Sequence, residues 1–526
     1  MKEKTAGGYR LILGYLGIFL ILVGIICLLP LLMLIPYPNE YQCWPSFVIP
    51  GVSAIVCGSG LSFLIFKRDK IQLGKFQDSI LLVCVWLIAI LVGAIPFMLR
   101  GMGTESFAAL KMKFTDAIFE STSGYTACGL TVFNFEKTAI GYHVYTTYRS
   151  LLLFFGGIGL VLVVTSAISD RYGLKLYTAE GHNDKLMPNL AKSARMILLI
   201  YVGYIILGTL SYWLIGGMEI FDSFNHAIAA VATGGFSTYA GGIPEIISNG
   251  GNNSITGMPI NGIAINVTSC VLMILGATNF VIHLFIFQGK FKKIYKDCEL
   301  RFFAMLCIIF VPLFTISILT SSKNELSFWD AVGEGTFNFI SHLSTTGFSS
   351  ATSIKSLGEG ALFLGTICMI IGGGMGSTGG AIKQYRLVVA FKSFYWSIRD
   401  RLSPKIMVHP HNIYRLGNER EVSKDETFEA YGYTVLYLVV LCVGSLLILF
   451  LSNDSIYSSA DCFYEFASAL SGTGLSVGLT NDNTLHNIMG IRWILSVGMF
   501  AGRLEIICIY FAFYRTIRDI FRKETV

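Results

Sequence analysis

A short glycine-bearing pattern occurs four times in this chain, and it constrains the fold more than any other feature of the sequence. Each copy is a run of small or hydroxyl-bearing residues, then a glycine, then a large apolar side chain. The copies are Thr126-Ala127-Cys128-Gly129-Leu130, Ala232-Thr233-Gly234-Gly235-Phe236, Ser344-Thr345-Thr346-Gly347-Phe348 and Ser471-Gly472-Thr473-Gly474-Leu475. The glycines before the apolar residue lie 106, 112 and 127 residues apart, so each repeat has the size of a domain rather than of a solenoid module.

The four copies also agree upstream of the glycine. An acid precedes the glycine by thirteen residues, at Asp116, Asp222, Glu334 and Asp461. A small residue precedes it by six, at Ser123, Ala229, Ser341 and Ser468. One such match is common in ordinary turns, but four at common offsets indicate an internal repeat. We expect the acids to cap the N-termini of short helices that lead into the loops, so that the helix C-termini favour a cation.

The composition places the repeats in a membrane. Of the 526 residues, 53% are hydrophobic and 14% are charged, and the mean hydropathy is +0.63, which leaves too little polar surface for a soluble globule. We predict an all-α integral membrane protein, since ten apolar runs are long enough to cross the bilayer. They lie near 9–36, 46–66, 79–99, 144–168, 194–216, 259–288, 302–320, 359–382, 430–452 and 488–514.

Basic residues predict the orientation. With the N-terminus in the cytosol, most of the 39 Lys and Arg residues fall on the cytosolic side, so both termini are expected there. This topology explains the net charge of +6, and no nucleic-acid partner is needed.

The order of apolar runs predicts the architecture. Residues 1–75 form a transmembrane hairpin outside the repeat, and four pore repeats follow, which we call units one to four: 76–185, 186–297, 298–425 and 426–526. Each unit has a full span, an apolar segment of about 12 residues, the glycine loop and a second span; a segment that short is expected to be re-entrant. Two crossings and one re-entrant segment return the chain to its starting side. The four units are therefore predicted to be parallel, around a central pseudo-fourfold pore with the loops on the outer side.

Four irregular loops at membrane depth predict an ion filter. Such backbone must be buried in protein or line a water-filled path, because lipid cannot satisfy its polar groups. Backbone carbonyls gathered around one axis can replace the hydration shell of a cation, and glycine admits the φ values that aim them inward. The predicted filter residues are Thr126, Ala127, Cys128, Gly129, Ala232, Thr233, Gly234, Gly235, Ser344, Thr345, Thr346, Gly347, Ser471, Gly472, Thr473 and Gly474.

The second spans carry motifs of their own. These are Tyr148-Arg149 with Gly156-Gly157-Ile158-Gly159 in unit one, Gly276-Ala277-Thr278-Asn279-Phe280 in unit two, Gly372 to Gly380 followed by Lys383 in unit three, and Gly502-Arg503-Leu504-Glu505 in unit four. With the four loops, they resemble the Trk/Ktr/HKT superfamily of potassium transporters, and the N-terminal hairpin is similar to that of the Trk membrane subunit. Ala127-Cys128 departs from the family, which commonly has threonines there.

The resemblance implies a function and partners. It implies potassium uptake across the bacterial inner membrane by four fused channel-type subunits, with potassium as substrate, no cofactor and no enzymatic activity. It further implies a homodimer and a separate cytosolic nucleotide-binding regulatory subunit.

A gate is expected beneath the filter. Unit three alone has a second span so rich in glycine that it should break, because each glycine costs about 1 kcal/mol relative to alanine in a helix. The residues concerned are Gly372, Gly373, Gly374, Gly376, Ser377, Thr378, Gly379 and Gly380. Arg503 is expected to hold this loop through its carbonyls, and Lys383 to begin the cytosolic half of the helix.

Other features leave alternatives open. Arg149 and Arg492 are expected to be interfacial anchors, and Glu120 and Glu465 either attract cations or act as buried struts. Gly374 to Gly379 also satisfies the dinucleotide fingerprint G-x-G-x-x-G, so a membrane oxidoreductase is an alternative that requires a preceding strand. A secondary transporter of another solute is a further alternative.

Overall fold

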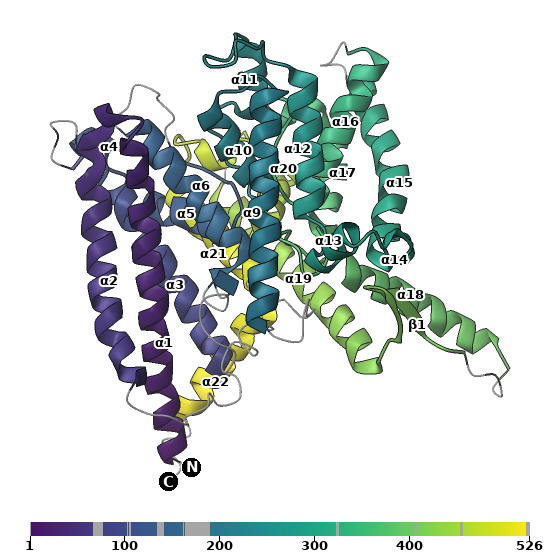
Figure 1. The fold of residues 1–526 in the computed structure, drawn as a ribbon. Coiled ribbons are helices and arrows are strands. Elements are labelled where there is room, and N and C mark those ends of the chain that lie inside the picture. The colour runs from purple at the N-terminus through teal and green to yellow at the C-terminus, as the bar shows by residue number, and fades with distance from the viewer. Residues whose placement is uncertain are drawn as a thin grey trace.

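The computed structural model describes residues 2–66, 77–102, 104, 107–133, 141–160, 162–163, 190–321, 326–404, 407, 409–452 and 456–521. The predicted boundaries between the hairpin and unit one, and between units one and two, lie outside these residues. The fold is that of an all-α membrane protein. Long helices stand side by side, from α1, α2 and α3 at one side of the molecule to α15 at the other (Figure 1).

The N-terminal hairpin consists of α1 (Lys2–Leu28) and α2 (Trp44–Phe66), which the short 3-10 helices η1 (Leu29–Leu34) and η2 (Pro38–Cys43) connect. Glycines let the two long helices pack closely. A Cβ on Gly17 would lie 2.6 Å from the carbonyl oxygen of Gly58, and one on Gly24 would lie 2.6 Å from that of Gly51. Small residues at such contacts allow close van der Waals packing where lipid provides no hydrophobic driving force.

The four units repeat one order of helices. The first long helices are α3 (Gln77–Met98), α9 (Leu190–Leu214), α15 (Cys298–Thr320) and α19 (Lys424–Leu451). The short helices before the glycine loops, here called pore helices, are α5 (Phe114–Tyr125), α10 (Ile220–Val231), α16 (Phe328–Leu343) and α20 (Ser459–Ser471). The second helices begin with α6 (Tyr142–Ile158), α12 (Gly262–Gly276), α17 (Glu359–Ile371) and α21 (Ile488–Arg503).

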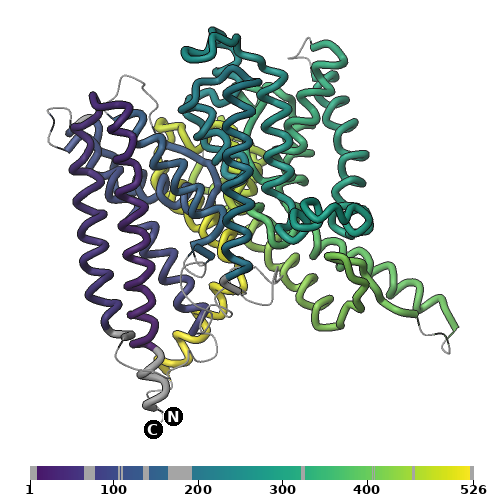
Figure 2. The backbone as a smooth tube through the Cα atoms, viewed as in Figure 1, coloured from purple at the N-terminus to yellow at the C-terminus, as the bar shows by residue number. Residues whose placement is uncertain are grey.

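The units close into a ring. The second helix of each unit packs against the pore helix of the next: α6 against α10, α12 against α16, α17 against α20, and α21 against α5. The backbone trace shows the C-terminal segment returning beside the N-terminal part of the chain (Figure 2). The last helix, α22 (Ile506–Phe521), accordingly packs against α3. This circular order surrounds a single axis, as the repeat predicts.

The second spans differ from the prediction. Among the described residues, six helices are long and apolar enough to cross a membrane without a break, and two bent pairs could each be one further span. The helices α12 and α13 (Phe280–Phe287) meet at 109°, and α21 and α22 at 97°. In unit one, α6 ends at Ile158 and is followed by Gly159, whose φ is 93°. All four second spans are therefore interrupted, and the expectation of a break in unit three alone was wrong.

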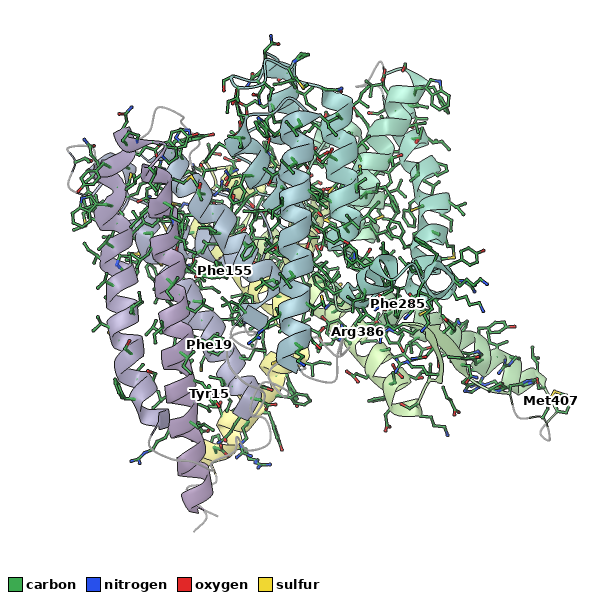
Figure 3. The ribbon with its side chains drawn as sticks, viewed as in Figure 1. Tyr15, Phe19, Phe155, Phe285, Arg386 and Met407 are labelled. Atoms are coloured by element: carbon green, nitrogen blue, oxygen red, sulfur yellow. The ribbon has the colours of Figure 1, made fainter. Side chains whose placement is uncertain are left out.

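Unit three is distinguished instead by the length of its interruption. Residues 372–383, which we call the 372–383 loop, separate α17 from α18 (Gln384–Leu402). Beyond α18 come the strands β1 (Asn412–Arg415) and β2 (Asn418–Glu421), an antiparallel hairpin that the sequence pattern did not predict. Its turn, Leu416-Gly417, has φ values of 47° and 80°, as a two-residue hairpin turn of type I′ requires. The end of α18 projects from the helices (Figure 1), and Met407 marks the tip of this arm, far from Arg386 (Figure 3).

The remaining elements are short. They are the helices α4 (Phe107–Leu110), α11 (Gly242–Asn249) and α14 (Phe291–Lys296), and the 3-10 helices η3 (Ile354–Leu357) and η4 (Leu479–Asn481).

Candidate functional site: a ring of four loops and the loop beneath it

All four pore helices end in the same backbone motif. The residue two positions before each repeat glycine is left-handed, with φ of 53° at Ala127, 50° at Thr233, 57° at Thr345 and 74° at Gly472. The next residue donates its N–H to the carbonyl five positions back, and the four pairs are Cys128 to Ser123, Gly234 to Ala229, Thr346 to Ser341 and Thr473 to Ser468, at 2.9–3.0 Å. These bonds belong to the Schellman motif, which ends a helix with a left-handed residue. The small residue six positions before the glycine is therefore the carbonyl acceptor that closes each pore helix.

The repeat glycines bring the four loops together. Their φ values are 99° at Gly129, 64° at Gly235, 85° at Gly347 and 84° at Gly474, a region that L side chains rarely adopt. A Cβ on each glycine would also overlap with a carbonyl oxygen of the next loop, and the pairs are Gly129 with Gly234, Gly235 with Thr346, Gly347 with Thr473, and Gly474 with Cys128. These four contacts link the four loops in a closed circle. The predicted filter residues thus form one ring, here called the glycine ring.

Hydroxyl groups brace the loops from within. Ser344 and Thr346 share a hydrogen bond of 2.7 Å, and Ser471 and Thr473 share one of the same length. Unit one has no such pair, because Thr126 donates to the Thr122 carbonyl and position 128 is a cysteine. The Cys128 thiol lies 3.8 Å from the Ser468 carbonyl of the unit-four pore helix. The departure at Cys128 therefore replaces a hydroxyl pair with a thiol contact in unit one, while the backbone of the loop keeps the conformation shared by the other units.

A buried polar residue in each pore helix also holds the loop in place, and the sequence revealed only two of the four. The residue nine positions before each glycine is buried and bonds to the chain that leaves the ring; the four are Glu120, His226, Asn338 and Glu465. Glu120 accepts from Thr131 and from the Val132 N–H, and Glu465 from Ser476 and the Val477 N–H. These two glutamates are buried struts. The common offset is the signal that could have found His226 and Asn338, although the residue types differ.

Arg149 and Arg492 are not interfacial anchors. Arg149 is 1% exposed, and its Nε lies 2.6 Å from Oε1 of Glu120, which is fully buried. The Arg149 guanidinium also lies 3.9 Å from the centre of the Phe236 ring in unit two. Arg492 is 5% exposed and pairs with Asp116 of unit one at 2.7 Å. Both arginines tie the structure around the ring together, and the expectation of snorkelling side chains was wrong.

The acids of the repeat have divergent roles. Asp461 forms a capping box with Ser458 at the start of α20, as expected. Asp222 instead accepts from Thr238 at 2.7 Å and from Tyr239 at 3.3 Å, and Asp116 pairs with Arg492. In unit three the helix begins at Phe328, so Ser327 caps it and Glu334 lies beyond the first turn. The capping prediction thus holds for unit four and was wrong for Glu334.

The 372–383 loop contacts the underside of the glycine ring. Thr233 donates to Thr378 at 3.1 Å, Thr378 donates to the Gly276 carbonyl at 2.8 Å, and the Gly380 N–H donates to Thr345 Oγ1 at 2.9 Å. A small cavity separates the loop from units one and four. It is lined by Thr126, Ala127, Thr378, Gly380, Ser471, Gly472, Met499, Gly502 and Arg503. The predicted gate residues therefore lie directly against the predicted filter.

Arg503 joins the 372–383 loop to unit one. Its guanidinium donates to the Thr378 carbonyl at 3.2 Å, to Gly156 at 2.5 Å and to Gly157 at 2.7 Å. Two residues later, Glu505 pairs with Arg386 at 2.7 Å and with Lys383 at 3.6 Å. Lys383 is the residue immediately before α18 and is 9% exposed. The breaks in units one, three and four are thus joined by charged groups, of which Lys383 and Arg386 are buried and Arg503 and Glu505 are partly buried.

Comparison with known proteins identifies the family. The family model TrkH, described as a cation transport protein, matches residues 43–518. This chain belongs to the TrkH family. It is 28% identical over 506 residues to the Trk system potassium uptake protein TrkH of Escherichia coli K12, covering 90% of this chain and 95% of that protein. It is also 28% identical over 518 residues to the uncharacterized cation transporter MJ1485 of Methanocaldococcus jannaschii, with 96% of both chains covered.

A solved structure has the same fold. The crystal structure of the potassium transporter TrkH from Vibrio parahaemolyticus matches with a TM-score of 0.75 and 24% identity, and the match covers 95% of this chain and 98% of that one. As a member of the TrkH family, the chain is a multi-pass membrane protein for cation transport, and it is not an enzyme.

Family membership and local structure exclude the oxidoreductase alternative. A dinucleotide fingerprint must follow a strand within a βαβ unit. In this TrkH-family chain, Gly374 to Gly379 follow the helix α17 and precede the helix α18. Their glycines permit the irregular path of the 372–383 loop instead.

Proposed function

We propose that this TrkH-family protein takes up potassium through the glycine ring, which acts as its selectivity filter. The observation that carries the proposal is the closed circuit of contacts, in which each repeat glycine approaches a backbone carbonyl of the next loop. Four copies of one loop conformation supply carbonyl groups from four directions, as replacement of a cation's hydration shell requires. The relatives named as potassium uptake proteins support potassium as the cation.

The membrane potential supplies the driving force. One elementary charge that crosses about 100 mV gains about 2.3 kcal/mol, which corresponds to roughly 50-fold accumulation. A coupled ion is therefore unnecessary for uptake.

The 372–383 loop is the gate in this proposal. It lies against the ring through Thr378 and Gly380, and Arg503 bonds it from unit four. Arg503 also places a fixed positive charge beside the cavity under the ring. Like charge repels an approaching cation most strongly where little water screens it. Displacement of the loop together with Arg503 would open the path.

The proposal includes an assembly and a location. The protein functions as a homodimer in the bacterial inner membrane, with both termini in the cytoplasm, and a cytosolic nucleotide-binding subunit regulates it. The distribution of Lys and Arg supports the orientation, and the relatives' names as components of a Trk system support a multi-component transporter. The projecting end of α18 and the β1–β2 hairpin offer a surface for such a subunit.

Ion flux into liposomes tests the function. Purified full-length protein should pass potassium and rubidium in preference to sodium, under an imposed inside-negative potential. Equal flux of sodium would contradict the filter, and flux of an organic solute alone would instead favour a secondary transporter. Arg399→Ala, a change at an exposed ion pair on α18, serves as the control variant and should transport as the unmodified protein does.

A further inference from the structure

Glu299 is a buried carboxylate outside the glycine ring. It is the second residue of α15 and is 3% exposed. Its Oε2 accepts a hydrogen bond of 2.8 Å from the Met375 N–H in the 372–383 loop. Its Oε1 accepts one of 3.1 Å from Arg415 Nε, at the end of β1. A single side chain therefore connects the loop beneath the glycine ring to the β1–β2 hairpin.

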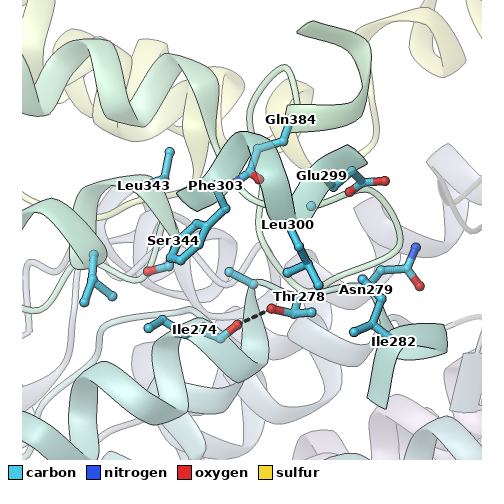
Figure 4. Close-up of a pocket in the computed structure, with 13 residues that line it drawn as sticks. Ile274, Thr278, Asn279, Ile282, Glu299, Leu300, Phe303, Leu343, Ser344 and Gln384 are labelled. Atoms are coloured by element: carbon cyan, nitrogen blue, oxygen red, sulfur yellow. Dashed lines mark hydrogen bonds between the residues drawn. The ribbon is translucent and has the colours of Figure 1, made fainter. Parts of the chain in front are cut away.

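The Met375 peptide is held on both sides. Its carbonyl accepts a hydrogen bond of 2.5 Å from Asn279 Nδ2, at the break between α12 and α13. Glu299 and Asn279 lie on the same side of a pocket that Gly374 also lines (Figure 4). These bonds fix the loop at Met375, whereas Thr378 and Gly380 fix it against the ring.

The turn of the hairpin is anchored beside Glu299. The Leu416 N–H donates to Asp297 Oδ2 at 2.9 Å, and Oδ1 of the same aspartate caps the N-terminus of α15. Arg415 is 6% exposed, and its guanidinium lies 4.1 Å from the centre of the Tyr385 ring in α18. All four residues of β2 are exposed. One strand of the hairpin therefore faces the buried carboxylate, and the other faces outward where a force can act on it.

We infer that Glu299 is a positioning residue for the 372–383 loop and that Arg415 controls it, so the hairpin transmits a force on the cytosolic surface to the gate. Withdrawal of Arg415 leaves the carboxylate buried without its cation, a state that a low-dielectric site strongly disfavours. The carboxylate must then move toward water or take up a proton. Either change alters its bond to the Met375 N–H and loosens the loop. The inference rests on the proposed gating role of that loop.

Flux measurements on paired variants test the connection. Arg415→Gln and Glu299→Gln should each raise rubidium flux into liposomes, by roughly tenfold if the loss of a charge-assisted hydrogen bond favours the open state. The double variant should not exceed the larger single effect, because both residues act through one bond network. Potassium selectivity should stay unchanged. Effects that multiply in the double variant, or folded variants with unaltered flux, would overturn the inference.

Arg420→Gln is the matched control. Arg420 lies on β2 of the same hairpin but pairs with Glu426 at 2.6 Å and donates to the Tyr385 hydroxyl. Within the part of the chain that the structure describes, it bonds neither to Glu299 nor to the 372–383 loop. This variant should transport as the unmodified protein does. If Arg420→Gln raises flux as much as Arg415→Gln, the effect belongs to the hairpin's stability and not to Glu299.

Hydrogen exchange separates the connection from the transport function. In Arg415→Gln, peptides that cover residues 372–383 should exchange faster, whereas in Arg420→Gln they should not. If Arg415→Gln fails to fold, Arg415→Lys retains the charge but not the planar guanidinium, and it should give an intermediate increase. Unmodified protein that conducts no rubidium at all would contradict the proposed function. Unchanged hydrogen exchange of residues 372–383 in folded Arg415 variants would instead contradict the connection between the hairpin and the loop.

Discussion

The glycine ring and the four helix breaks beneath it derive from the same repeat, yet only the ring keeps one geometry. The four loops share a left-handed residue, a Schellman bond and a glycine with positive φ. The breaks differ: in unit one the helix is interrupted after Ile158, units two and four bend by 109° and 97°, and unit three inserts the 372–383 loop. A cation surrounded by carbonyls needs equivalent contacts from all sides, whereas an obstruction needs only one segment. The repeat is therefore preserved in the ring, where the proposed filter needs all four units, and it diverges in the breaks, where the proposed gate needs only one.

The largest effect is expected from a side chain in the ring. Gly347→Ser places a Cβ on the Thr473 carbonyl and forces a serine to adopt a φ of 85°. We expect discrimination between potassium and sodium to be lost, as measured by competitive rubidium and sodium flux. Gly333→Ser, on the same pore helix where a Cβ meets open space, is the control and should retain selectivity. Unchanged selectivity in Gly347→Ser would show that the ring is not the filter.

Loss of a buried ion pair beside the glycine ring should lower the stability of the folded protein. Arg149→Ala leaves the Glu120 carboxylate, which is fully buried, without its cation. Removal of one partner of a buried pair typically destabilises a protein by about 3–5 kcal/mol. The midpoint of thermal unfolding in detergent should fall markedly. A Glu120→Gln/Arg149→Gln double variant, which removes both charges, should be more stable than Arg149→Ala, and the opposite order would contradict a structural role for the pair.

Changes beneath the glycine ring should alter the rate of ion flux and not the selectivity for potassium. Arg503→Ala removes three hydrogen bonds to the Thr378, Gly156 and Gly157 carbonyls and one positive charge. Because a hydrogen bond to a charged group contributes about 1.5–3 kcal/mol, flux should rise by about tenfold or more. Shortening the 372–383 loop should have the same direction of effect and weaken dependence on a regulatory subunit. A folded, selective protein without the loop that conducts no faster would make the glycines a packing device.

The smallest effect is expected at a partly exposed ion pair between units three and four. Lys355 of unit three pairs with Asp461 of unit four at 3.0 Å, but the lysine side chain is 36% exposed. Exposed pairs of this kind contribute about 0–1 kcal/mol. Lys355→Ala should therefore lower the unfolding midpoint much less than Arg149→Ala and leave flux unaltered. A loss as large as that of Arg149→Ala would mean that the surface between units three and four, rather than the buried struts, holds the ring together.

Local pattern was sufficient to predict the repeated part of the site. A Schellman motif and a glycine with positive φ are set by residues within one turn of the chain, so Ser341 and Gly347 could be placed from their spacing alone. The His226 and Asn338 braces were missed because the equivalent positions in units one and four are glutamates. Different side chains can hold the same loop when each offers one hydrogen bond, and such equivalence does not appear as a sequence pattern.

The sequence by itself determined that this chain is an all-α membrane protein in which one order of helices, with a glycine loop, occurs four times. It could do so because hydropathy and backbone propensity act over short segments. Only the tertiary structure decided how charged residues are used. Arg149 pairs with Glu120, Arg492 crosses from unit four to Asp116 of unit one, and Glu299 joins the hairpin to the 372–383 loop. A buried charge is stable only beside its partner. Partners that lie between 29 and 376 residues apart are brought together by the closure of the ring.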